Sequence, residues 1–189
     1  MPELMVDLIV SLDGWAAADG WPGLWGMGGP EYVDFLGEQE DHTILMGATT
    51  YRLMSGMADE EPEAVAQLGA MPKVVFSSTL TAPLDWDNSE LVSTAPVEAV
   101  RAMKADSPLP LRTLGSLTLA RSLLVAGLVD RLRLVVFPVI TGATGRERVF
   151  DGYPDVRLEM VGSRTFDGRL QLLEYAPTVL DAPPGQGRP

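Results

Sequence analysis

Glycine and small polar residues follow three strands that the apolar pattern of the sequence predicts. Helices are predicted to begin directly behind two of these strand ends, over 48–56 and 116–126. The first N–H groups of a helix have no acceptor within the helix and, with the positive end of the helix dipole, they bind phosphate. Two such helix starts could therefore hold the two phosphates of a dinucleotide. The residues in question are Gly47, Ala48, Thr49 and Thr50 behind strand 42–47, Ser77 and Ser78 at the end of strand 73–78, and Gly115, Ser116, Leu117 and Thr118 behind strand 109–114.

Each of these residues, taken alone, also has an ordinary structural explanation. Glycine is common at turns, and Ser or Thr is common at helix N-caps, whatever a protein binds. Three such strand ends in one chain favour a ligand site, because ligands of open α/β sheets lie beyond the carboxyl ends of the strands.

Four residues near the N-terminus could lie on the substrate side of such a site. Glu31 is a candidate proton donor, because a carboxyl group in an apolar pocket has a raised pKa. Alternatively, it is a first-turn acid that complements the dipole of its helix. Asp13 could contact substrate, although an Asp-Gly turn explains this residue more simply. Trp25 lies in loop 14–29, which contains six glycines and three tryptophans, and Phe35 lies one helical turn beyond Glu31.

Alternating strand and helix patterns predict the elements that position these residues. This alternation predicts a mostly parallel, helix-covered sheet, and Asp167-Gly168 predicts an antiparallel hairpin at its edge. We expect one domain over 1–176 and a disordered tail over 177–189, which has four prolines, two glycines and no periodicity. The predicted strands are 4–12, 42–47, 73–78, 109–114, 130–140, 156–166 and 169–176, and the predicted helices are 31–39, 48–56, 62–69, 96–106 and 116–126.

Composition argues against several classes of function. The 189-residue chain has no cysteine and one histidine, which excludes thiolate metal sites, and we expect no metal. A net charge of −12 argues against nucleic acid or an anionic membrane as a partner. No apolar run reaches membrane-spanning length, and the N-terminus carries acids where a signal peptide needs basic residues, so we expect a cytoplasmic protein.

Three stretches together resemble the dihydrofolate reductase superfamily. ILMGATTYRLM (44–54) resembles its strand that ends in Met-Gly before a Thr and an aromatic residue, and KVVFSST (73–79) resembles the next strand with its Ser pair. The stretch 114–140 resembles the phosphate turn, helix and strand that follow. With SLDG at 11–14, the chain looks most similar to the reductase domain of the bacterial riboflavin-pathway deaminase-reductase and its stand-alone bacterial relatives. The resemblance covers 3–176 and implies a three-layer α/β/α, dihydrofolate reductase-like fold.

The resemblance also implies roles for the candidate residues. It places a phosphate at the turn behind strand 42–47, the adenosine ribose near the Ser pair, and the pyrophosphate at the turn behind strand 109–114. It makes 14–29 a mobile loop over the nicotinamide, and it gives Glu31 the place of an acid that the folate enzymes carry four residues before a phenylalanine. Ala48 departs from the family, because the folate enzymes commonly have an arginine there that meets the 2′-phosphate of NADPH. The preference between NADPH and NADH therefore stays open.

These inferences predict a reductase that binds NADPH, with NADH not excluded. It would transfer a hydride to a C=N or C=O bond of a small heterocycle of the pterin, pyrimidine or flavin-precursor kind. We expect Asp13, Trp25 and Phe35 to contact that substrate, and a homodimer is compatible with the sequence. The alternative is a regulatory module of the same fold, which keeps the nucleotide site but has no turnover.

Overall fold

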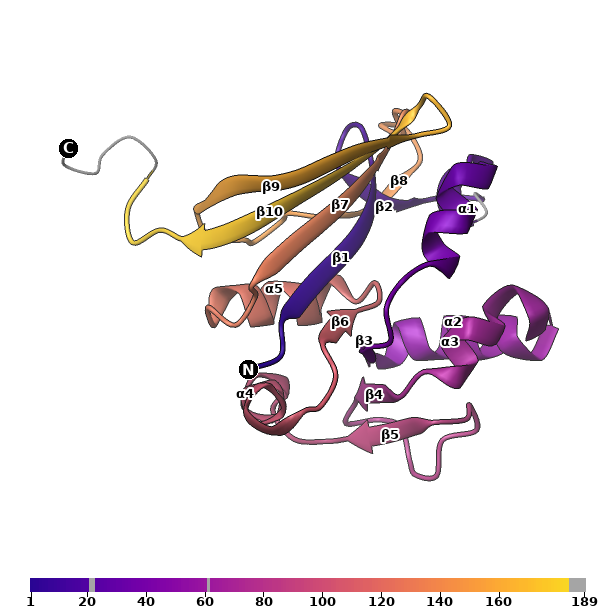
Figure 1. The fold of residues 1–189 in the computed structure, drawn as a ribbon, viewed down its shortest axis with the longest axis vertical. Coiled ribbons are helices and arrows are strands. Elements are labelled where there is room, and N and C mark those ends of the chain that lie inside the picture. The colour runs from indigo at the N-terminus through magenta and orange to yellow at the C-terminus, as the bar shows by residue number, and fades with distance from the viewer. Residues whose placement is uncertain (21–22, 61, 184–189) are drawn as a thin grey trace. The chain divides into compact units, whose positions relative to one another are not determined.

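The chain folds into two compact units, each built from two stretches of the sequence. The computed structural model describes residues 1–20, 23–60 and 62–183 (Figure 1). Across these ranges every helix is too short or too polar to span a bilayer. Unit 1 contains Met1–Val6 and Glu40–Leu128, and unit 2 contains Asp7–Gln39 and Val129–Pro189.

Unit 1 is a parallel sheet with helices on both faces. Its elements are the start of β1 (Leu4–Ser11), β3 (Thr43–Gly47), α2 (Ala48–Glu60), η2 (Pro62–Val65), α3 (Ala66–Ala70), β4 (Lys73–Phe76), β5 (Ser89–Val92), α4 (Pro96–Asp106), β6 (Leu111–Thr113) and α5 (Leu117–Val125). The strand order is β5-β4-β3-β6-β1, with every neighbouring pair parallel. The chain moves outward from β3 to β5 and then returns to β6. Because parallel crossovers are right-handed, the helices of the two paths lie on opposite faces, and Figure 1 shows α2 and α3 on one side of these strands and α4 and α5 on the other.

A buried lysine at the start of β4 connects the sheet of unit 1 to helix α3. All four residues of β4 are buried, and Lys73 is 1% exposed. Its ammonium group donates hydrogen bonds of 2.8–3.0 Å to the carbonyls of Leu68, Gly69 and Met71. The same group lies 4.6 Å from the centre of the Trp86 ring. Burial lowers the pKa of Lys73 to about 8, and its contacts fix the end of α3 to β4.

In its described part, unit 2 contains antiparallel strand pairs and helix α1. Its elements are the remainder of β1, β2 (Trp15–Ala18), η1 (Gly23–Gly26), α1 (Pro30–Gly37), β7 (Arg131–Phe137), β8 (Gly145–Arg148), β9 (Val156–Phe166) and β10 (Leu170–Val179). β10 pairs with both β7 and β9 in the antiparallel sense, and β2 pairs with β8 in a separate small sheet. Asp167 and Gly168 connect β9 to β10 with φ of 51° and 64°, as a tight hairpin turn requires.

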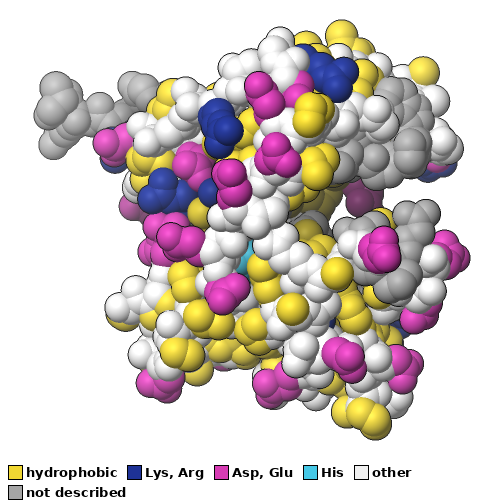
Figure 2. Space-filling model, turned by 45° about the vertical axis from the view of Figure 1, so that its right-hand side comes forward, with side chains coloured by type: hydrophobic (Ala, Val, Ile, Leu, Met, Phe, Trp, Pro, Cys, Tyr) yellow, Lys and Arg dark blue, Asp and Glu magenta, His cyan; other side chains and the backbone are white. Residues whose placement is uncertain are grey.

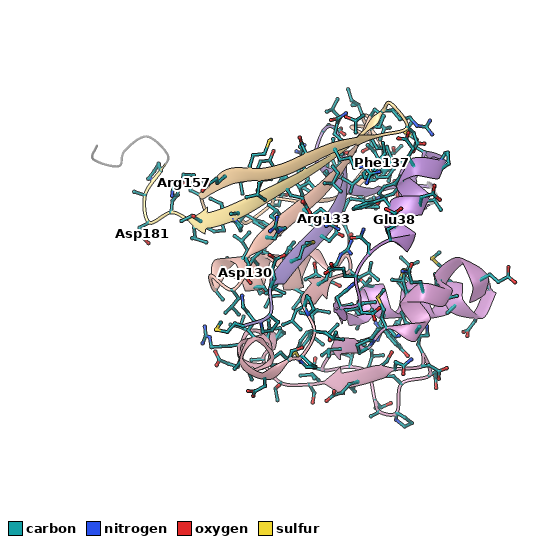
Figure 3. The ribbon with its side chains drawn as sticks, in the orientation of Figure 1. Glu38, Asp130, Arg133, Phe137, Arg157 and Asp181 are labelled. Atoms are coloured by element: carbon teal, nitrogen blue, oxygen red, sulfur yellow. The ribbon has the colours of Figure 1, made fainter. Side chains whose placement is uncertain are left out.

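Aromatic rings form the core of unit 2. The fully buried ring of Phe137 lies 5.2 Å from that of Trp25 and 6.0 Å from that of Tyr32. Phe166, at the end of β9, lies 5.6 Å from Tyr32 and 4.8 Å from Phe35. Figure 3 shows Phe137 beside helix α1. The spacing of Tyr32 and Phe35 puts both rings on one face of α1, and this face packs against the sheet.

The predicted fold class is confirmed, because the structure has a mostly parallel central sheet with helices and the antiparallel β9–β10 hairpin. The sequence pattern misses β2, β5 and β8, which have four residues each. β10 continues three residues beyond the boundary predicted at 176, with Val179 opposite Val156. Pro177 obscures this continuation in the sequence, although proline is tolerated towards the ends and edges of sheets.

Candidate functional site

The side chain of Ser116 joins the turn behind β6 to the end of β3. Its hydroxyl oxygen accepts a hydrogen bond from the backbone N–H of Gly47 at 2.8 Å and lies 2.9 Å from the hydroxyl oxygen of Thr50. Gly115 and Ser116 both adopt left-handed backbone conformations, with φ of 55° and 60°. Two such residues in succession turn the chain sharply from β6 into α5. The structure thus brings together predicted residues that lie 69 positions apart in the sequence.

The N-terminus of α5 has no side-chain cap among the described residues. Ser116 occupies the N-cap position, but its hydroxyl contacts Gly47 and Thr50 instead of the first turn of its own helix. The first N–H groups of an α-helix have no acceptor within the helix and lie at the positive end of its dipole. Gly115 and Thr118 are exposed, while Leu117 is half-buried. An anion can therefore approach this helix start.

The second predicted phosphate turn lies beside the first. α2 begins at Ala48, directly behind β3, and Thr49 in its first turn is exposed. The N–H of Gly47 is already donated to Ser116, and a Cβ atom on Gly47 would lie 3.7 Å from the Ser116 hydroxyl oxygen. The starts of α2 and α5 therefore meet at Ser116.

Gly115 is required by the turn itself, whatever binds there. A Cβ atom on Gly115 would lie 3.2 Å from the Thr50 hydroxyl oxygen, and its φ of 55° is one that other residues rarely adopt. A phosphate against the backbone of Gly115 would be a second reason for glycine. The two reasons need separate experiments.

Ser77 organises the turn behind β4. Its hydroxyl oxygen accepts hydrogen bonds from the N–H groups of Thr79 and Leu80 at 3.0 and 3.1 Å. Its own N–H donates to the carbonyl of Val92 in β5 at 3.1 Å. The hydroxyl oxygens of Ser77 and Thr79 lie 3.3 Å apart, and Ser78 is exposed. The predicted adenosine side thus presents hydroxyl groups.

Sequence reasoning missed Arg52, which lies against this turn. Its guanidinium donates a hydrogen bond to the Thr79 hydroxyl at 3.3 Å, and its side chain is exposed. Arg52 lies four residues after Ala48 in α2, and residues four apart share one face of a helix. This spacing is the signal that could have found it.

In unit 2, Glu31 is engaged by a residue of the β9–β10 turn. The carboxylate of Asp167 accepts hydrogen bonds from the N–H groups of Glu31 at 3.1 Å and Tyr32 at 3.4 Å. In return, the Glu31 carboxylate accepts a hydrogen bond from the N–H of Asp167 at 2.6 Å. A Cβ atom on Gly29 would collide with the Asp167 carboxyl group. These contacts give Glu31 a structural partner, and its role as a proton donor stays a prediction.

Asp13 is held in a polar turn at the end of β1. Its carboxylate accepts hydrogen bonds from the Ser11 hydroxyl at 2.7 Å and from the N–H of Thr141 at 3.1 and 3.2 Å. The Ser11 hydroxyl oxygen also accepts from the N–H of Trp15 at 2.9 Å. Desolvation by burial raises the pKa of Asp13, but the hydrogen bonds outweigh it and the net pKa is lowered. The turn explains Asp13 without a ligand, and its contact with substrate stays a prediction.

Trp25 and Phe35 lie in the aromatic core of unit 2. Trp25 is 6% exposed. Phe35 is partly buried and has the guanidinium of Arg133 at 5.3 Å from its ring centre. Their contact with substrate also stays a prediction. Trp21 lies outside the described residues.

The candidate residues divide between the two units. All those predicted to bind the cofactor belong to unit 1, whereas Asp13, Trp25, Glu31 and Phe35 belong to unit 2. Among the described residues, no group of three or more His, Cys, Asp or Glu side chains is placed to hold a metal ion.

Comparison with known proteins gives a family match along most of the chain. The RibD C-terminal domain model matches residues 2–172. An uncharacterized protein of Bacillus subtilis (strain 168), YyaP, is 27% identical over 182 residues, which cover 92% of this chain and 94% of YyaP.

Solved structures share the fold at lower identity. A proposed riboflavin biosynthesis protein from Shewanella sp. PV-4 has a TM-score of 0.70 and 19% identity, with 93% of this chain and 99% of that one covered. A diaminohydroxyphosphoribosylaminopyrimidine deaminase/5-amino-6-(5-phosphoribosylamino)uracil reductase from Thermotoga maritima has a TM-score of 0.65 and 16% identity. The match covers 94% of this chain and 57% of the Thermotoga chain. At these identities the similarity concerns the fold alone.

Proposed function

Because the chain belongs to the RibD C-terminal domain family, we propose that it is a reductase that uses a reduced nicotinamide dinucleotide, with NADPH as the expected cofactor. The hydride acceptor is a C=N or C=O bond of a small heterocycle of the pterin, pyrimidine or flavin-precursor kind. The name of the Thermotoga maritima relative, which includes a uracil-derivative reductase, supports the pyrimidine class.

The observation that carries this proposal is the pair of helix starts that meet at Ser116. The Ser116 hydroxyl is engaged by Gly47 and Thr50, so the first turn of α5 keeps its N–H groups available for an anion. This local arrangement matters because the chain carries a net charge of −12. Figure 2 shows acidic side chains spread over one face of the molecule. Backbone dipoles attract phosphate at short range even on such a surface.

We propose that the dinucleotide contacts the described residues in three places. The starts of α2 and α5 would hold the two linked phosphates, and the Ser77–Thr79 turn would hold the adenosine ribose. When bound, the cofactor supplies the hydride, while the protein orients it and excludes water. Glu31 would supply the proton, and Asp13, Trp25 and Phe35 would contact the substrate.

A titration with NADPH and NADH tests this proposal directly. Emission from the tryptophans, including Trp15 and Trp25, and the melting temperature are followed together. We expect saturable binding, and at a ligand concentration of ~100 times Kd the stabilisation should be about 2.7 kcal/mol. Oxidation of NADPH is then followed with a panel of pterins, pyrimidines and flavin precursors. A protein that neither responds to nor is stabilised by either dinucleotide would contradict the proposal.

A regulatory nucleotide-binding module is the second candidate, and one observation favours it. The Glu31 carboxylate already accepts a hydrogen bond from the N–H of Asp167 at 2.6 Å, so the proposed proton donor is committed to a structural contact. This candidate predicts saturable NADPH binding without oxidation on any member of the panel. Turnover on one substrate would exclude it.

We also propose that a second copy of the chain covers strand β9. This strand has eleven residues, and Leu158, Met160 and Val161 on it are 40%, 57% and 48% exposed. A long exposed strand with apolar side chains is a site for pairing between chains. Light scattering should give the mass of a dimer, and Met160→Lys should shift it to that of a monomer. A monomeric wild type would contradict this proposal.

A further inference from the structure

Arg133 connects strands β7 and β10 of unit 2 to the segment that follows helix α1. It lies on β7 and is 9% exposed (Figure 3). Its Nε and Nη2 atoms both lie 2.8 Å from one carboxylate oxygen of Glu174 on β10. Its Nη1 atom donates a hydrogen bond to the side-chain oxygen of Gln39 at 2.7 Å and lies 3.8 Å from the Asp7 carboxylate. All four residues belong to unit 2, and these contacts hold the guanidinium in one orientation.

The same network reaches the last turn of α1 in two ways. The side-chain N–H of Gln39 donates a hydrogen bond to the backbone carbonyl of Phe35 at 2.7 Å, and the Arg133 guanidinium lies 5.3 Å from the centre of the Phe35 ring. At the other end of α1, the Asp167 carboxylate accepts hydrogen bonds from N–H groups of the first turn. A helix of eight residues is too short to be stable alone in water, so its position depends on such contacts. α1 is therefore fixed at both ends.

The sheet leaves room for the carboxylate that holds Arg133. Gly162 on β9 pairs with Glu174, and a Cβ atom on Gly162 would lie 3.0 Å from the second carboxylate oxygen of Glu174. A buried ion pair is a weak source of stability, because apolar side chains of similar volume often stabilise a protein as well or better. Its hydrogen bonds are directional, however, and a planar guanidinium holds its partners at fixed angles. The network is thus better suited to orienting α1 than to stabilising the fold.

We propose that Arg133 is a positioning residue, which acts through Gln39 and Phe35 to hold α1 where Glu31 can deliver its proton. This inference rests on the proposed function, in which Glu31 is the proton donor and Phe35 contacts the substrate. Both residues lie on α1, so a shift of this helix moves both. A displacement of about 1 Å can slow a reaction by about a hundredfold. Loss of Arg133 should therefore affect the hydride step and leave NADPH binding unchanged, because the proposed cofactor contacts belong to unit 1.

The test breaks this network at two points and includes a matched control. Arg133→Met removes every polar contact of the guanidinium. Gln39→Met removes the link to α1 but keeps the ion pair between Arg133 and Glu174, so no buried carboxylate loses its partner. Arg131→Met is the control, because it removes the same charge from the same strand, 3.9 Å from Glu174, and leaves Gln39 and Phe35 in place. Melting temperatures establish that each variant is folded.

Two measurements on the full chain follow the effect. Hydrogen exchange of the α1 amides should be about tenfold or more faster in Arg133→Met and Gln39→Met, because a hydrogen bond to a charged group is lost, and unchanged in Arg131→Met. Single-turnover oxidation of NADPH, with a substrate identified in the panel, should be about ten- to hundredfold slower in the same two variants, with an unchanged Kd for NADPH. A purely stabilising network would lower the melting temperature and leave the rate of the folded protein unchanged.

Two results would overturn the assignment of Arg133 while the proposed function stands. One is exchange at α1 that rises no further than in Arg131→Met, and the other is faster exchange with an unchanged hydride rate. If wild type oxidises NADPH with no substrate of the panel, the proposed function itself fails. The role of Arg133 in the hydride step then fails with it, and hydrogen exchange alone shows whether Arg133 fixes α1.

Discussion

The helix starts of α1 and α5 differ in what occupies them. In unit 2, the Asp167 carboxylate accepts hydrogen bonds from the first N–H groups of α1, at 3.1 and 3.4 Å. In unit 1, the N-cap residue Ser116 directs its hydroxyl to Gly47 and Thr50, and no side chain of the described part caps α5. One helix start is filled by the protein's own acid, whereas the other is available to an anion.

This difference shows how a helix start can serve stability or binding. A carboxylate at a helix N-terminus satisfies donors and complements the dipole, which stabilises the fold. A helix start without a cap lacks that stabilisation, and a bound phosphate can supply the same interactions. Changes at the first site should therefore alter the stability of the protein, and changes at the second should alter its affinity for phosphate-bearing ligands.

The largest effect is expected at Glu31, which lies at the filled helix start but is also the proposed proton donor. In Glu31→Gln, the amide oxygen can still accept the hydrogen bond from the N–H of Asp167, while the ionisable proton is lost. We expect NADPH affinity to be unchanged and the hydride step to slow by about 10²–10⁴-fold. Single-turnover oxidation of NADPH, with a substrate identified in the panel, measures this rate.

Glu31→Ala separates catalysis from capping. It removes the hydrogen bond to Asp167 as well as the proton, so it should lower the urea midpoint as well as the rate. An unchanged rate in Glu31→Gln, together with a lowered midpoint in Glu31→Ala, would assign Glu31 a purely structural role.

The next effect tests the available helix start at Gly115. Gly115→Asp places a carboxylate where the phosphate should lie, and Gly115→Asn is nearly the same shape without the charge. In both variants the Cβ atom would lie 3.2 Å from the Thr50 hydroxyl oxygen, and both residues tolerate the left-handed conformation better than most. The pair therefore shares the steric cost. We expect NADPH to bind Gly115→Asp about tenfold or more weakly than Gly115→Asn, because like charges repel. Equal affinities in two folded variants would make the turn structural.

Local signals in the sequence are sufficient to predict the parallel sheet, the hairpin at Asp167-Gly168 and the three polar strand ends. Each of these depends on neighbouring residues, such as glycine behind a strand or an Asp-Gly turn. The small β2–β8 sheet depends on contacts between distant residues. A Cβ atom on Gly145 would meet the ring of Trp15 at 2.5 Å, and the Arg148 guanidinium lies 4.5 Å from the centre of that ring. Neither strand shows this pairing in its own sequence.

The residues of the candidate site also differ in whether local sequence signals can predict them. Gly115 and Ser116 can be proposed from their place behind a strand, but Arg52 becomes a candidate only when Thr79, 27 residues away, is seen beside it. The partner of Glu31 lies 136 residues away. A pattern that shows an acid in the first turn of a helix cannot show that a distant hairpin already engages it. The sequence therefore leaves open whether a helix start is filled.

A smaller effect is expected at Asp167, which fills the start of α1. Asp167→Gly removes the carboxylate without strain at its φ of 51°. Asp167→Asn keeps an acceptor oxygen but loses the charge. Loss of a side-chain cap lowers the free energy of unfolding by about 0.5–2 kcal/mol, and loss of the charge alone by about 0.3–1 kcal/mol. Urea unfolding should rank wild type, Asp167→Asn and Asp167→Gly in that order, with NADPH affinity unchanged. A loss of affinity without a loss of stability would contradict the comparison between the two helix starts.

The smallest effect concerns Asp13, another acid of unit 2 that accepts a hydrogen bond from a backbone N–H group. Its hydrogen bonds from Ser11 and Thr141 form with the ionised carboxylate, and the pKa of Asp13 is lowered from 3.8. A carboxyl group with a lowered pKa in the folded state stabilises the protein above its unfolded pKa, and this contribution is lost as pH falls through the folded value.

Wild type should therefore have a higher urea midpoint than Asp13→Asn at pH 7, and the gap should shrink as pH falls below 3.8. Asp19→Asn is the control, because Asp19 is exposed and its carboxylate pairs with Arg146 instead of accepting from Ser11 or Thr141. A gap that is constant with pH would show that the ionised carboxylate of Asp13 does not stabilise the turn. Carboxylates such as that of Asp13, which accept hydrogen bonds from the protein's own N–H groups, should make stability depend on pH and leave NADPH affinity unchanged. The helix start at Gly115 should behave in the opposite way.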